Sequence, residues 1–320
     1  MSSSAPVDVT GTPETPDPSE RPGVLEEAQV RAMFDRIAGL YDRMNSVMTA
    51  GLHHAWRRRA ADVAQLAPGQ RALDVATGTG DLAFELARRV GPAGEVVASD
   101  FSERMLELAR AKALAGGGPQ VRFESANALA LPYADDAFDA ATVGFGARNF
   151  SDLAGGLREM VRVVRPGGRV VVLEITTPQR PPLSTFFTLW FDRIVPALGH
   201  LAGDAQAYTY LPDSVRRFPG PQELARVLWE AGLRDVSYVL TAGGIIALHA
   251  GTVESVESAG SGARGLTVPV ADSIGSSPHN VAPEAAGANS PSGTVKSPTD
   301  AAPSGTEGAN SRSIEEPGSA

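Results

Sequence analysis

The chain has 320 residues, of which 42% are hydrophobic and 20% are charged, and its formal net charge is -9. This composition supplies enough apolar surface for one or two globular domains with a buried core, and it excludes a wholly disordered or collagen-like chain. The absence of cysteine excludes disulfide scaffolds, thiolate metal sites and cysteine nucleophiles, so any chemistry must use oxygen and nitrogen groups.

The two ends of the chain differ in composition from its middle. All 19 aromatic residues lie between Phe34 and Tyr238, whereas residues 1–23 and 251–320 are rich in Ser, Pro, Gly and Ala. The two ends also carry most of the negative charge, which leaves the middle nearly neutral. Segments of this kind bury too little apolar area to offset the entropy of ordering. We therefore expect one domain over residues 24–250, between a disordered N-terminal segment and a disordered low-complexity tail.

The sequence predicts a cytoplasmic protein without a nucleic-acid partner. No run of residues approaches the roughly 18 consecutive apolar positions of a membrane-spanning helix, and the first 17 residues lack the charged and apolar regions of a signal peptide. Nearly all of the 28 basic residues are arginines, a bias more typical of a GC-rich genome than of nucleic-acid binding.

Within residues 24–250, helical patterns come first and then alternate with strand patterns. Short β-rich runs occupy residues 72–76, 95–99, 121–124, 138–143 and 170–175. Helical patterns cover residues 26–40, 52–65, 81–90, 102–114, 152–164, 183–198 and 221–231. Alternation of this kind argues for a three-layer α/β fold, in which helices cover both faces of a mostly parallel, Rossmann-like sheet. The two helices ahead of the first strand then form an N-terminal lid.

The ends of several elements carry recognisable signals. Ser102 and Ser151 are expected as helix N-caps, and the Pro-Gly-Gly sequence at 166–168 is expected to end the preceding helix. Two final runs, 236–240 and 244–250, are separated by three residues and predict a β-hairpin. We therefore expect a seven-stranded sheet that is parallel except for this hairpin.

The strongest local signal is the glycine turn that follows the first predicted strand. Gly78 and Gly80 allow the backbone to approach a ligand closely, and the free N–H groups at the next helix start suit an anionic group. In an open α/β sheet this turn lies at the end of the sheet where ligands bind. Asp100 ends the second strand and is placed to bind both hydroxyls of a ribose. The pattern therefore predicts a nucleoside ligand.

Three further positions bear on which nucleoside is bound. The turn also fits the dinucleotide pattern G-x-G-x-x-A, so a nicotinamide-dependent oxidoreductase is an alternative. Asp74, inside the first strand, would attract a ligand with an amine and repel a pyrophosphate. Asn127 and Ala128 follow the third strand and can read an adenine edge. These positions favour S-adenosylmethionine, although Asp74 could instead cap a neighbouring turn while the glycines only permit tight packing.

With these residues in place, the middle of the chain resembles the class I S-adenosylmethionine-dependent methyltransferases. Residues 41–45 (YDRMN), with His53 and Trp56, and residues 162–168 (RVVRPGG), running to Glu174, are similar to the two signature patterns of the menaquinone and ubiquinone C-methyltransferase family. Between them, residues 145–149 (FGARN) match the F-G-x-R-N segment of that family.

The resemblance places the cofactor at Thr79, Asp100, Asn127 and Ala128, to which the local chemistry adds Asp74, Gly78 and Gly80. Some positions depart from the family pattern: Thr49 and Thr176 replace serine, Arg165 replaces lysine, and Gly144 replaces a serine that often contacts the cofactor.

The resemblance implies methyl transfer to a ring carbon of a polyprenylated quinol, which converts demethylmenaquinol to menaquinol. A benzoquinol of ubiquinone biosynthesis is the alternative substrate, and a non-catalytic protein that binds S-adenosylmethionine is an alternative function. Because a phenol has a pKa near 10, the ring needs help to ionise. We expect Arg148 to stabilise the oxyanion, Asn149 to orient it, and Tyr41 to bond the ring oxygen or move its proton.

Other roles for these side chains stay open. Arg148 could merely pair with a carboxylate such as Asp139 on the rim, and Tyr41 could be a core aromatic residue packed on Trp56. The adjacent His53 and His54 could be ordinary lid or surface residues, and we expect no metal site.

The predicted helix at 183–198 has aromatic residues nearly all the way round. That is more than a one-sided surface helix needs. We expect it either to wall the quinol pocket and contact the membrane peripherally, or to be buried in the core.

Overall fold

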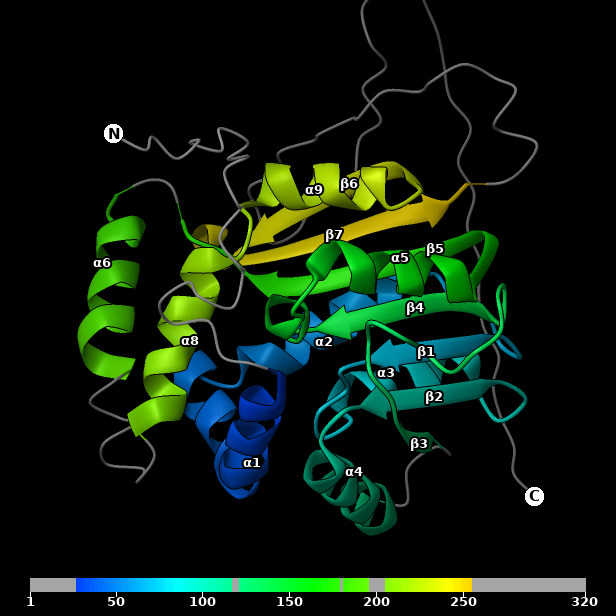
Figure 1. The fold of residues 1–320 in the computed structure, drawn as a ribbon, viewed down its shortest axis with the longest axis horizontal. Helices are drawn as coiled ribbons and strands as arrows, with labels where there is room; N and C mark the ends of the chain where they lie inside the picture. The colour runs from blue at the N-terminus through cyan, green and yellow to red at the C-terminus, as the bar shows by residue number, and fades with distance from the viewer. Residues whose placement is uncertain (1–26, 117–120, 179–180, 196–204, 255–320) are drawn as a thin grey trace, which may run out of the picture. The chain divides into compact units, whose positions relative to one another are not determined.

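The computed structural model describes residues 27–116, 121–178, 181–195 and 205–254. Both predicted tails lie outside these ranges, apart from residues 251–254. Figure 1 shows the described elements as one sheet with helices packed around it.

The sheet has seven strands in the order β3-β2-β1-β4-β5-β7-β6. Its first five strands are parallel, and β7 runs antiparallel to its neighbours β5 and β6. The strands are β1 (Arg71–Val75), β2 (Glu95–Asp100), β3 (Arg122–Ser125), β4 (Phe138–Gly144), β5 (Val164–Ile175), β6 (Leu233–Thr241) and β7 (Ile246–Val253). The predicted parallel sheet with a C-terminal hairpin is therefore confirmed, with β7 reaching three residues beyond the predicted end.

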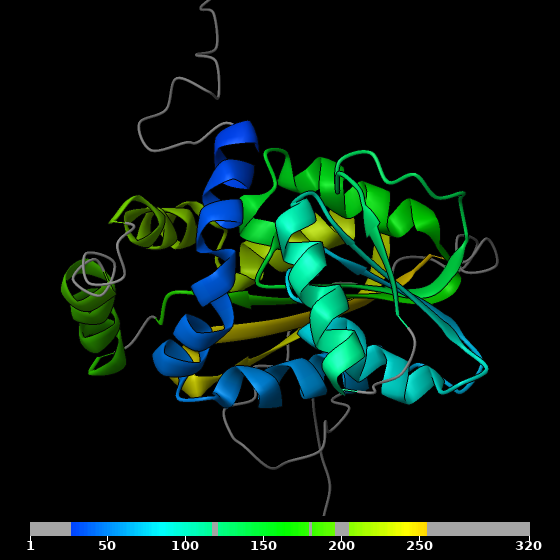
Figure 2. The ribbon, with the colours of Figure 1, turned by 90° about the horizontal axis from the view of Figure 1, so that it is seen from below.

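Helices cover both faces of this sheet, as the three-layer prediction requires. The α-helices are α1 (Glu27–Thr49), α2 (Leu52–Val63), α3 (Asp81–Val90), α4 (Glu103–Gly116), α5 (Leu153–Val163), α6 (Leu183–Leu189), α8 (Ala205–Arg217) and α9 (Pro221–Glu230). Shorter helical turns are η2 (Ala147–Asn149), η3 (Trp190–Ile194) and η4 (Ala242–Gly244). Figure 2 shows α2 and α3 on one face and α5 and α9 on the other.

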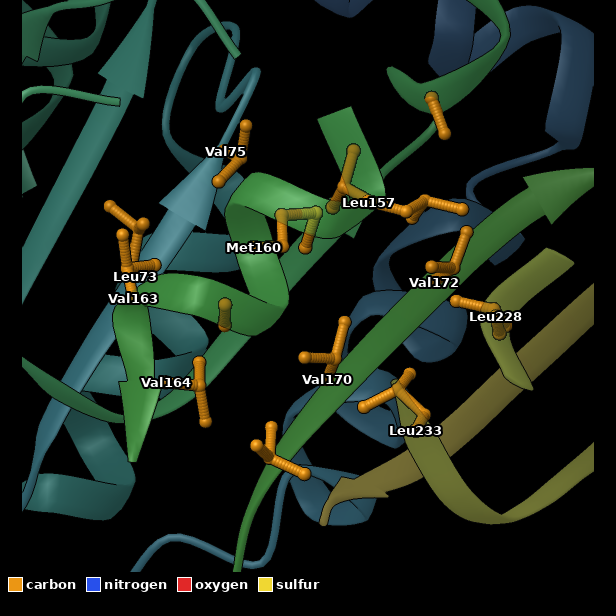
Figure 3. Packing of buried hydrophobic residues seen from close by; sticks show 14 of the residues in the cluster. Leu73, Val75, Leu157, Met160, Val163, Val164, Val170, Val172, Leu228 and Leu233 are labelled. Carbon is orange, nitrogen blue, oxygen red and sulfur yellow. The ribbon is translucent and has the colours of Figure 1, made fainter. Parts of the chain in front are cut away.

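The core forms because the central strands are apolar on both faces, as strands covered by helices on both sides must be. In β1, Leu73 lies beside Val97 of β2 and Ala141 of β4. Figure 3 shows side chains from the sheet, α5 and α9 packed together; they include Leu73, Val75, Leu157, Met160, Val163, Val170, Val172 and Leu228. All of them are buried, and burial of each large one contributes about 1.5–3 kcal/mol.

One of the two predicted helix N-caps is confirmed, and the other lies one residue later than predicted. Ser102 caps α4 as expected, since its Oγ accepts a hydrogen bond from the Met105 amide at 3.2 Å. The cap of α5, however, is Asp152 and not Ser151, because the Asp152 carboxylate accepts from the Gly155 amide at 2.9 Å. Ser151 lies one residue earlier and has a shorter side chain, so the carboxylate of Asp152 is the group that bonds the free amide of the first turn.

The Pro-Gly-Gly sequence at 166–168 lies inside β5 and does not end a helix, so that prediction was wrong. Helix α5 already ends at Val163, and Val164 has extended dihedral angles of -97° and 129°. The pairing of β4 with β5 shifts register next to this sequence. A Cβ on Gly168 would lie 2.5 Å from the Asp139 carbonyl oxygen, so the glycine permits a close approach of two strands at a bulge.

Two helices exceed what the sequence pattern predicts. The first extends from Glu27 to Thr49 instead of ending near residue 40, so the motif at 41–45 is helical. Helix α8 was not predicted, because Pro212 lies inside it and a proline ordinarily interrupts a helix. Both helices lie with α6 beyond the carboxyl ends of the parallel strands (Figure 1).

Among the described residues, no helix combines the length and apolar character needed to cross a membrane.

Candidate active site

Two neighbouring cavities lie at the carboxyl ends of the parallel strands. The smaller has a volume of about 60 Å³ and the larger about 440 Å³. Three aromatic side chains, Phe34, Tyr41 and Phe145, line both of them. The two cavities therefore share part of their lining, which we call the shared wall.

Asp100 and Gly78 form the polar part of the smaller cavity. Asp100 is buried at the end of β2, where Oδ2 accepts from the Gly78 amide at 2.8 Å and Oδ1 from the Ser102 amide at 2.9 Å. Burial raises the pKa of Asp100 to about 6, although its backbone hydrogen bonds oppose the rise. These two bonds leave acceptor capacity on both carboxylate oxygens. Such a carboxylate can accept hydrogen bonds from the two hydroxyls of a ribose.

Asn127 and Ala128 line the same cavity, as predicted for residues that read a base. The Asn127 side chain is held from two sides: its Nδ2 donates to Glu27 Oε1 at 2.8 Å, and its Oδ1 accepts from the Leu129 amide at 2.9 Å. Glu27 belongs to α1, so the N-terminal helix closes this end of the cavity.

Asp74, Thr79 and Gly80 shape the glycine turn and do not line either cavity. Asp74 is 1% exposed and accepts from the hydroxyls of Thr77 and Thr142, each at 2.6 Å. Burial raises its pKa to about 6, against the effect of these two bonds. Gly80 has φ +86, and a Cβ there would press on three neighbouring side chains at 3.2–3.3 Å. The Asp74 carboxylate thus fixes the glycine turn through its hydrogen bond with Thr77.

Thr79 links the turn to the lid. Its hydroxyl donates to Asp42 Oδ1 of α1 at 2.6 Å. Lys112 of α4 lies 2.7 Å from Asp42 Oδ2 and 2.7 Å from Asp81 Oδ1. Burial tends to raise the pKa of Asp81, but Arg57 and Lys112 outweigh it and the pKa falls below its usual range. We call this group of Asp42, Thr79, Asp81 and Lys112 the α1 latch.

Arg148 follows β4 and lies in the wall of the larger cavity. Its Nη1 lies 2.7 Å from Glu174 Oε1, and the exposed fractions of the two side chains are 8% and 1%. Burial tends to lower the pKa of Arg148, but the charge of Glu174 outweighs it, so the pKa rises and the guanidinium stays protonated. Arg148 Nε is buried and has no hydrogen-bond partner among the described residues. Arg148 thus places a fixed positive charge at the wall of the larger cavity.

Arg148 does pair with a carboxylate, as the alternative considered from the sequence held, but the partner is Glu174 and not Asp139. Asp139 lies at the other end of β4 and accepts from Arg165 Nε at 2.7 Å and from the Arg71 amide at 2.8 Å. Asp139 and Glu174 both lie in predicted strands, but the sequence could not show which of them the parallel pairing of β4 and β5 brings to Arg148.

Tyr41 lines both cavities, whereas Asn149 lines the smaller cavity and not the larger one that Arg148 lines. The ring of Tyr41 meets Phe34 edge-on at 6.2 Å, whereas Trp56 packs on Phe145. Tyr41 therefore lines the shared wall, and its ring contact is not the Trp56 contact considered from the sequence.

Tyr210 of α8 is a site residue that the sequence analysis missed. Its hydroxyl donates to Asn149 Oδ1 at 3.1 Å, and its side chain lines the larger cavity. It belongs to no motif, and Pro212 concealed the helix that carries it. Only tertiary packing brings α8 to η2.

The larger cavity is mainly apolar. Four aromatic residues of the predicted helix at 183–198 line it: Phe186, Phe187, Trp190 and Phe191. Phe187 and Phe191 are buried against α8, whereas Phe186 is 53% exposed. The helix thus has both an inner and an outer apolar face. Residues 196–198 of the predicted helix lie outside the described residues.

His53 and His54 differ in their surroundings. His53 is 2% exposed and lines the larger cavity, whereas His54 is exposed. Burial, followed by the charges of Arg57 and His54, lowers the pKa of His53 to about 4. One nitrogen of each histidine and an Asp81 oxygen lie within 4.8 Å of one another. Because Asp81 already faces Arg57 and Lys112, a metal ion there would compete with two cations.

The chain matches known proteins over nearly all of the described residues. The model of the ubiE/COQ5 methyltransferase family matches residues 23–253. A demethylmenaquinone methyltransferase of Deinococcus radiodurans is 48% identical over 217 residues, which cover 67% of this chain and 88% of that protein. A demethylmenaquinone methyltransferase of Thermus thermophilus is 47% identical over 220 residues, covering 68% and 99%. A ubiquinone/menaquinone biosynthesis C-methyltransferase UbiE of Hahella chejuensis is 40% identical over 232 residues, covering 72% and 93%.

These matches agree with the fold and with the motifs that the sequence analysis identified. They confirm the prediction of a methyltransferase that uses S-adenosyl-L-methionine. The chain belongs to the ubiE/COQ5 methyltransferase family.

Proposed function

We propose that the protein methylates a ring carbon of demethylmenaquinol to give menaquinol. The observation that carries this proposal is the shared wall between a small cavity at the glycine turn, which Asp100 and Asn127 line, and a large apolar cavity that Arg148 lines. The names of the two relatives with the highest quoted identities support the naphthoquinol substrate over a benzoquinol.

The small cavity would hold the cofactor. Asp100 would accept from the ribose hydroxyls, the backbone at Gly78 would lie against the cofactor, and Asn127 and Ala128 would flank the adenine. When bound, S-adenosyl-L-methionine supplies an electrophilic methyl group. Asp74 would contribute by holding the turn in shape through Thr77 and Thr142.

Arg148 would make the ring carbon nucleophilic. A phenol with a pKa near 10 is scarcely ionised at neutral pH, and a buried cation beside the ring oxygen favours its anion. Glu174 fixes the guanidinium in the wall of the large cavity, where its charge would act on the oxygen. Because the guanidinium keeps its proton, Arg148 would stabilise charge and would not accept the hydroxyl proton.

Tyr41 would position the reacting ring, and Asn149, which lines the small cavity, would position the methyl donor against it. The Tyr210 hydroxyl occupies Asn149 Oδ1, so the amide nitrogen is the group that Asn149 can offer to a ligand. Tyr41 lies in the shared wall, where its hydroxyl could bond the ring oxygen or move its proton toward water.

We further propose that the outer apolar face beside the large cavity contacts the membrane in which a prenylated substrate resides. Four large apolar side chains from α1, α2 and α6 are more than half exposed: Val47, Leu52, Phe186 and Leu189. Val47, Leu52 and Phe186 also line the cavity. The prenyl chain could thus pass from the cavity to lipid without crossing water.

Substrate competition tests the proposed function. With radiolabelled S-adenosyl-L-methionine, a demethylmenaquinol analogue should be methylated with a higher kcat/KM than a matched benzoquinol analogue. A higher value for the benzoquinol would move the assignment to ubiquinone biosynthesis. Oxidation of a reduced pyridine nucleotide without any methyl transfer would refute it.

Vesicle binding tests the membrane contact. Phe186→Ser with Leu189→Ser should reduce co-sedimentation with anionic lipid vesicles several-fold, because about 25 cal/mol is lost per Å² of apolar area that no longer enters the lipid. Leu114→Ser on α4 is the matched control, since Leu114 is 86% exposed and does not line the cavity. Equal binding by all three proteins would count against the contact.

A further inference from the structure

His53 is a buried side chain of the large cavity to which the proposed mechanism gives no role. Its Nδ1 lies 2.7 Å from Thr49 Oγ1, one helical turn earlier in the chain. The Thr49 hydroxyl in turn donates to the Asn45 carbonyl oxygen at 2.7 Å. These two hydrogen bonds hold the imidazole at the wall of the large cavity, which both residues line.

The positions of the protons in this chain follow from the donors available. A threonine hydroxyl has one proton, and that of Thr49 is committed to Asn45. Thr49 Oγ1 must therefore accept from His53, which places the imidazole proton on Nδ1. Since a neutral imidazole has one N–H, Nε2 carries a lone pair. No described residue donates to Nε2 in a recorded hydrogen bond.

The location of His53 connects it to the reacting end of the cavity. It lies in the first turn of α2, and the same helix packs on Phe145 through Trp56 and Arg57. Phe145 is three residues before Arg148, and its carbonyl accepts from the Arg148 guanidinium. A ring bound beside Arg148 therefore occupies a cavity that His53 also lines.

We propose that His53 Nε2 accepts a hydrogen bond from a hydroxyl of the bound quinol and thereby selects the reduced ring over the quinone. This inference rests on the proposed function. A quinol offers O–H donors, whereas a quinone offers only carbonyl acceptors whose lone pairs would face the lone pair of Nε2. Arg148 donates to either form, so it cannot make this distinction.

The selection serves the reaction because only the reduced ring has a hydroxyl whose ionisation activates the ring carbon. An oxidised ring would occupy the cavity without reacting. A site built to receive a donor rejects a ligand that lacks one, because its own polar group is then left unpaired.

Equilibrium binding to the full chain, with adenosylhomocysteine present to prevent turnover, tests the proposal. The probes are the reduced and oxidised forms of one short-chain naphthoquinone. Wild-type protein should bind the reduced form roughly tenfold more tightly. In His53→Phe this ratio should fall to near one, mainly through weaker binding of the reduced form. His54→Phe is the control and should keep the wild-type ratio.

Variants of Thr49 keep the imidazole in place and alter only its proton. In Thr49→Val the ring loses the acceptor that holds its proton on Nδ1, so Nε2 can become a donor and the ratio should fall. Thr49→Ser keeps the acceptor and should restore the ratio. This pair decides the question even if His53→Phe does not fold.

Equal binding of both forms by wild-type protein, or an unchanged ratio in both His53→Phe and Thr49→Val, would overturn the proposal while methyl transfer continued. Failure of the proposed function has a different signature, because wild-type protein would then fail to methylate the naphthoquinol or would prefer the benzoquinol.

Discussion

At the residue scale, the Arg148 and Glu174 pair is the feature from which the chemistry follows. The pair is buried, and Glu174 also accepts from the Ile175 amide at 2.8 Å, so the carboxylate is fixed by its own strand. A fixed carboxylate holds the guanidinium in one orientation before any ligand arrives. Such a preorganised cation stabilises developing charge more than a mobile one does.

Replacing Arg148 should slow the chemical step without loss of the cofactor. Arg148→Ala should lower turnover roughly 10²-fold or more, the effect of losing an oxyanion donor, and calorimetry should find unchanged adenosylhomocysteine binding. Because an unpaired buried Glu174 would destabilise the fold by about 3–5 kcal/mol, Arg148→Met with Glu174→Gln provides a matched variant. Unchanged turnover in both variants would remove Arg148 from the mechanism.

Tyr210→Phe isolates the positioning of Asn149. It removes one hydrogen bond to Oδ1, worth about 0.5–1.5 kcal/mol. We expect kcat to fall roughly two- to tenfold, with the KM for the methyl donor unchanged, in steady-state assays. A change confined to the KM for the methyl donor would contradict this role, because it would mean that Tyr210 affects only binding in the small cavity.

At the element scale, α1 is a cover that the latch fastens to the glycine turn. Its Glu27 bonds Asn127 near one end, and Asp42 bonds Thr79 and Lys112 further along. Both cavities use side chains of this helix. Opening α1 would therefore expose the cofactor and the quinol at the same time.

Lys112→Met should loosen this cover. Without the cation, Asp42 and Asp81 lose their shared partner. Amide hydrogen exchange across α1 should then quicken severalfold relative to wild type, while exchange in β1 stays unchanged. Arg104→Met on the same helix removes only a surface pair with Glu107 and serves as the control. Equal exchange in both variants would contradict the latch.

The elements that were predicted correctly are those whose pattern is set locally. The five parallel strands and the final hairpin follow from short β-rich runs between turn residues, and the cofactor turn follows from Gly78 and its neighbours. Tyr210 and the partner of Arg148 could not be predicted, because each depends on which distant element packs against η2. The Pro-Gly-Gly sequence was wrongly predicted to end a helix, because proline and glycine are typical both of helix ends and of β-bulges.

At the scale of the whole molecule, stability in acid reflects a buried histidine remote from the proposed chemistry. His249 is fully buried in β7; its Nε2 donates to the Pro221 carbonyl at 2.8 Å and its Nδ1 has no partner among the described residues. Burial lowers its pKa from 6.5 to about 4, although the bond to Pro221 opposes this. Between these values the unfolded chain binds the extra proton, so stability falls as pH drops from 6.5 toward 4.

His249→Leu should remove this part of the acid sensitivity. Between pH 7 and pH 5, the free energy of unfolding of wild type should fall by about 2 kcal/mol more than that of the variant. Wild type is compared with the variant because other groups also change the stability over this range. Asp74 and Asp100, with pKa values raised to about 6, act in the opposite direction over part of it in both proteins. Urea unfolding at the two pH values measures it. Parallel losses in both proteins would contradict the assignment.

The account as a whole requires a methyl group to pass between the two cavities to carbon. Incubation with S-adenosyl-L-methionine carrying a deuterated methyl group and a demethylmenaquinol analogue, followed by NMR of the product, measures this directly. The label should appear on the ring carbon beside a hydroxyl-bearing carbon. Label on an oxygen, or an unlabelled ring despite bound donor and quinol, would contradict the account.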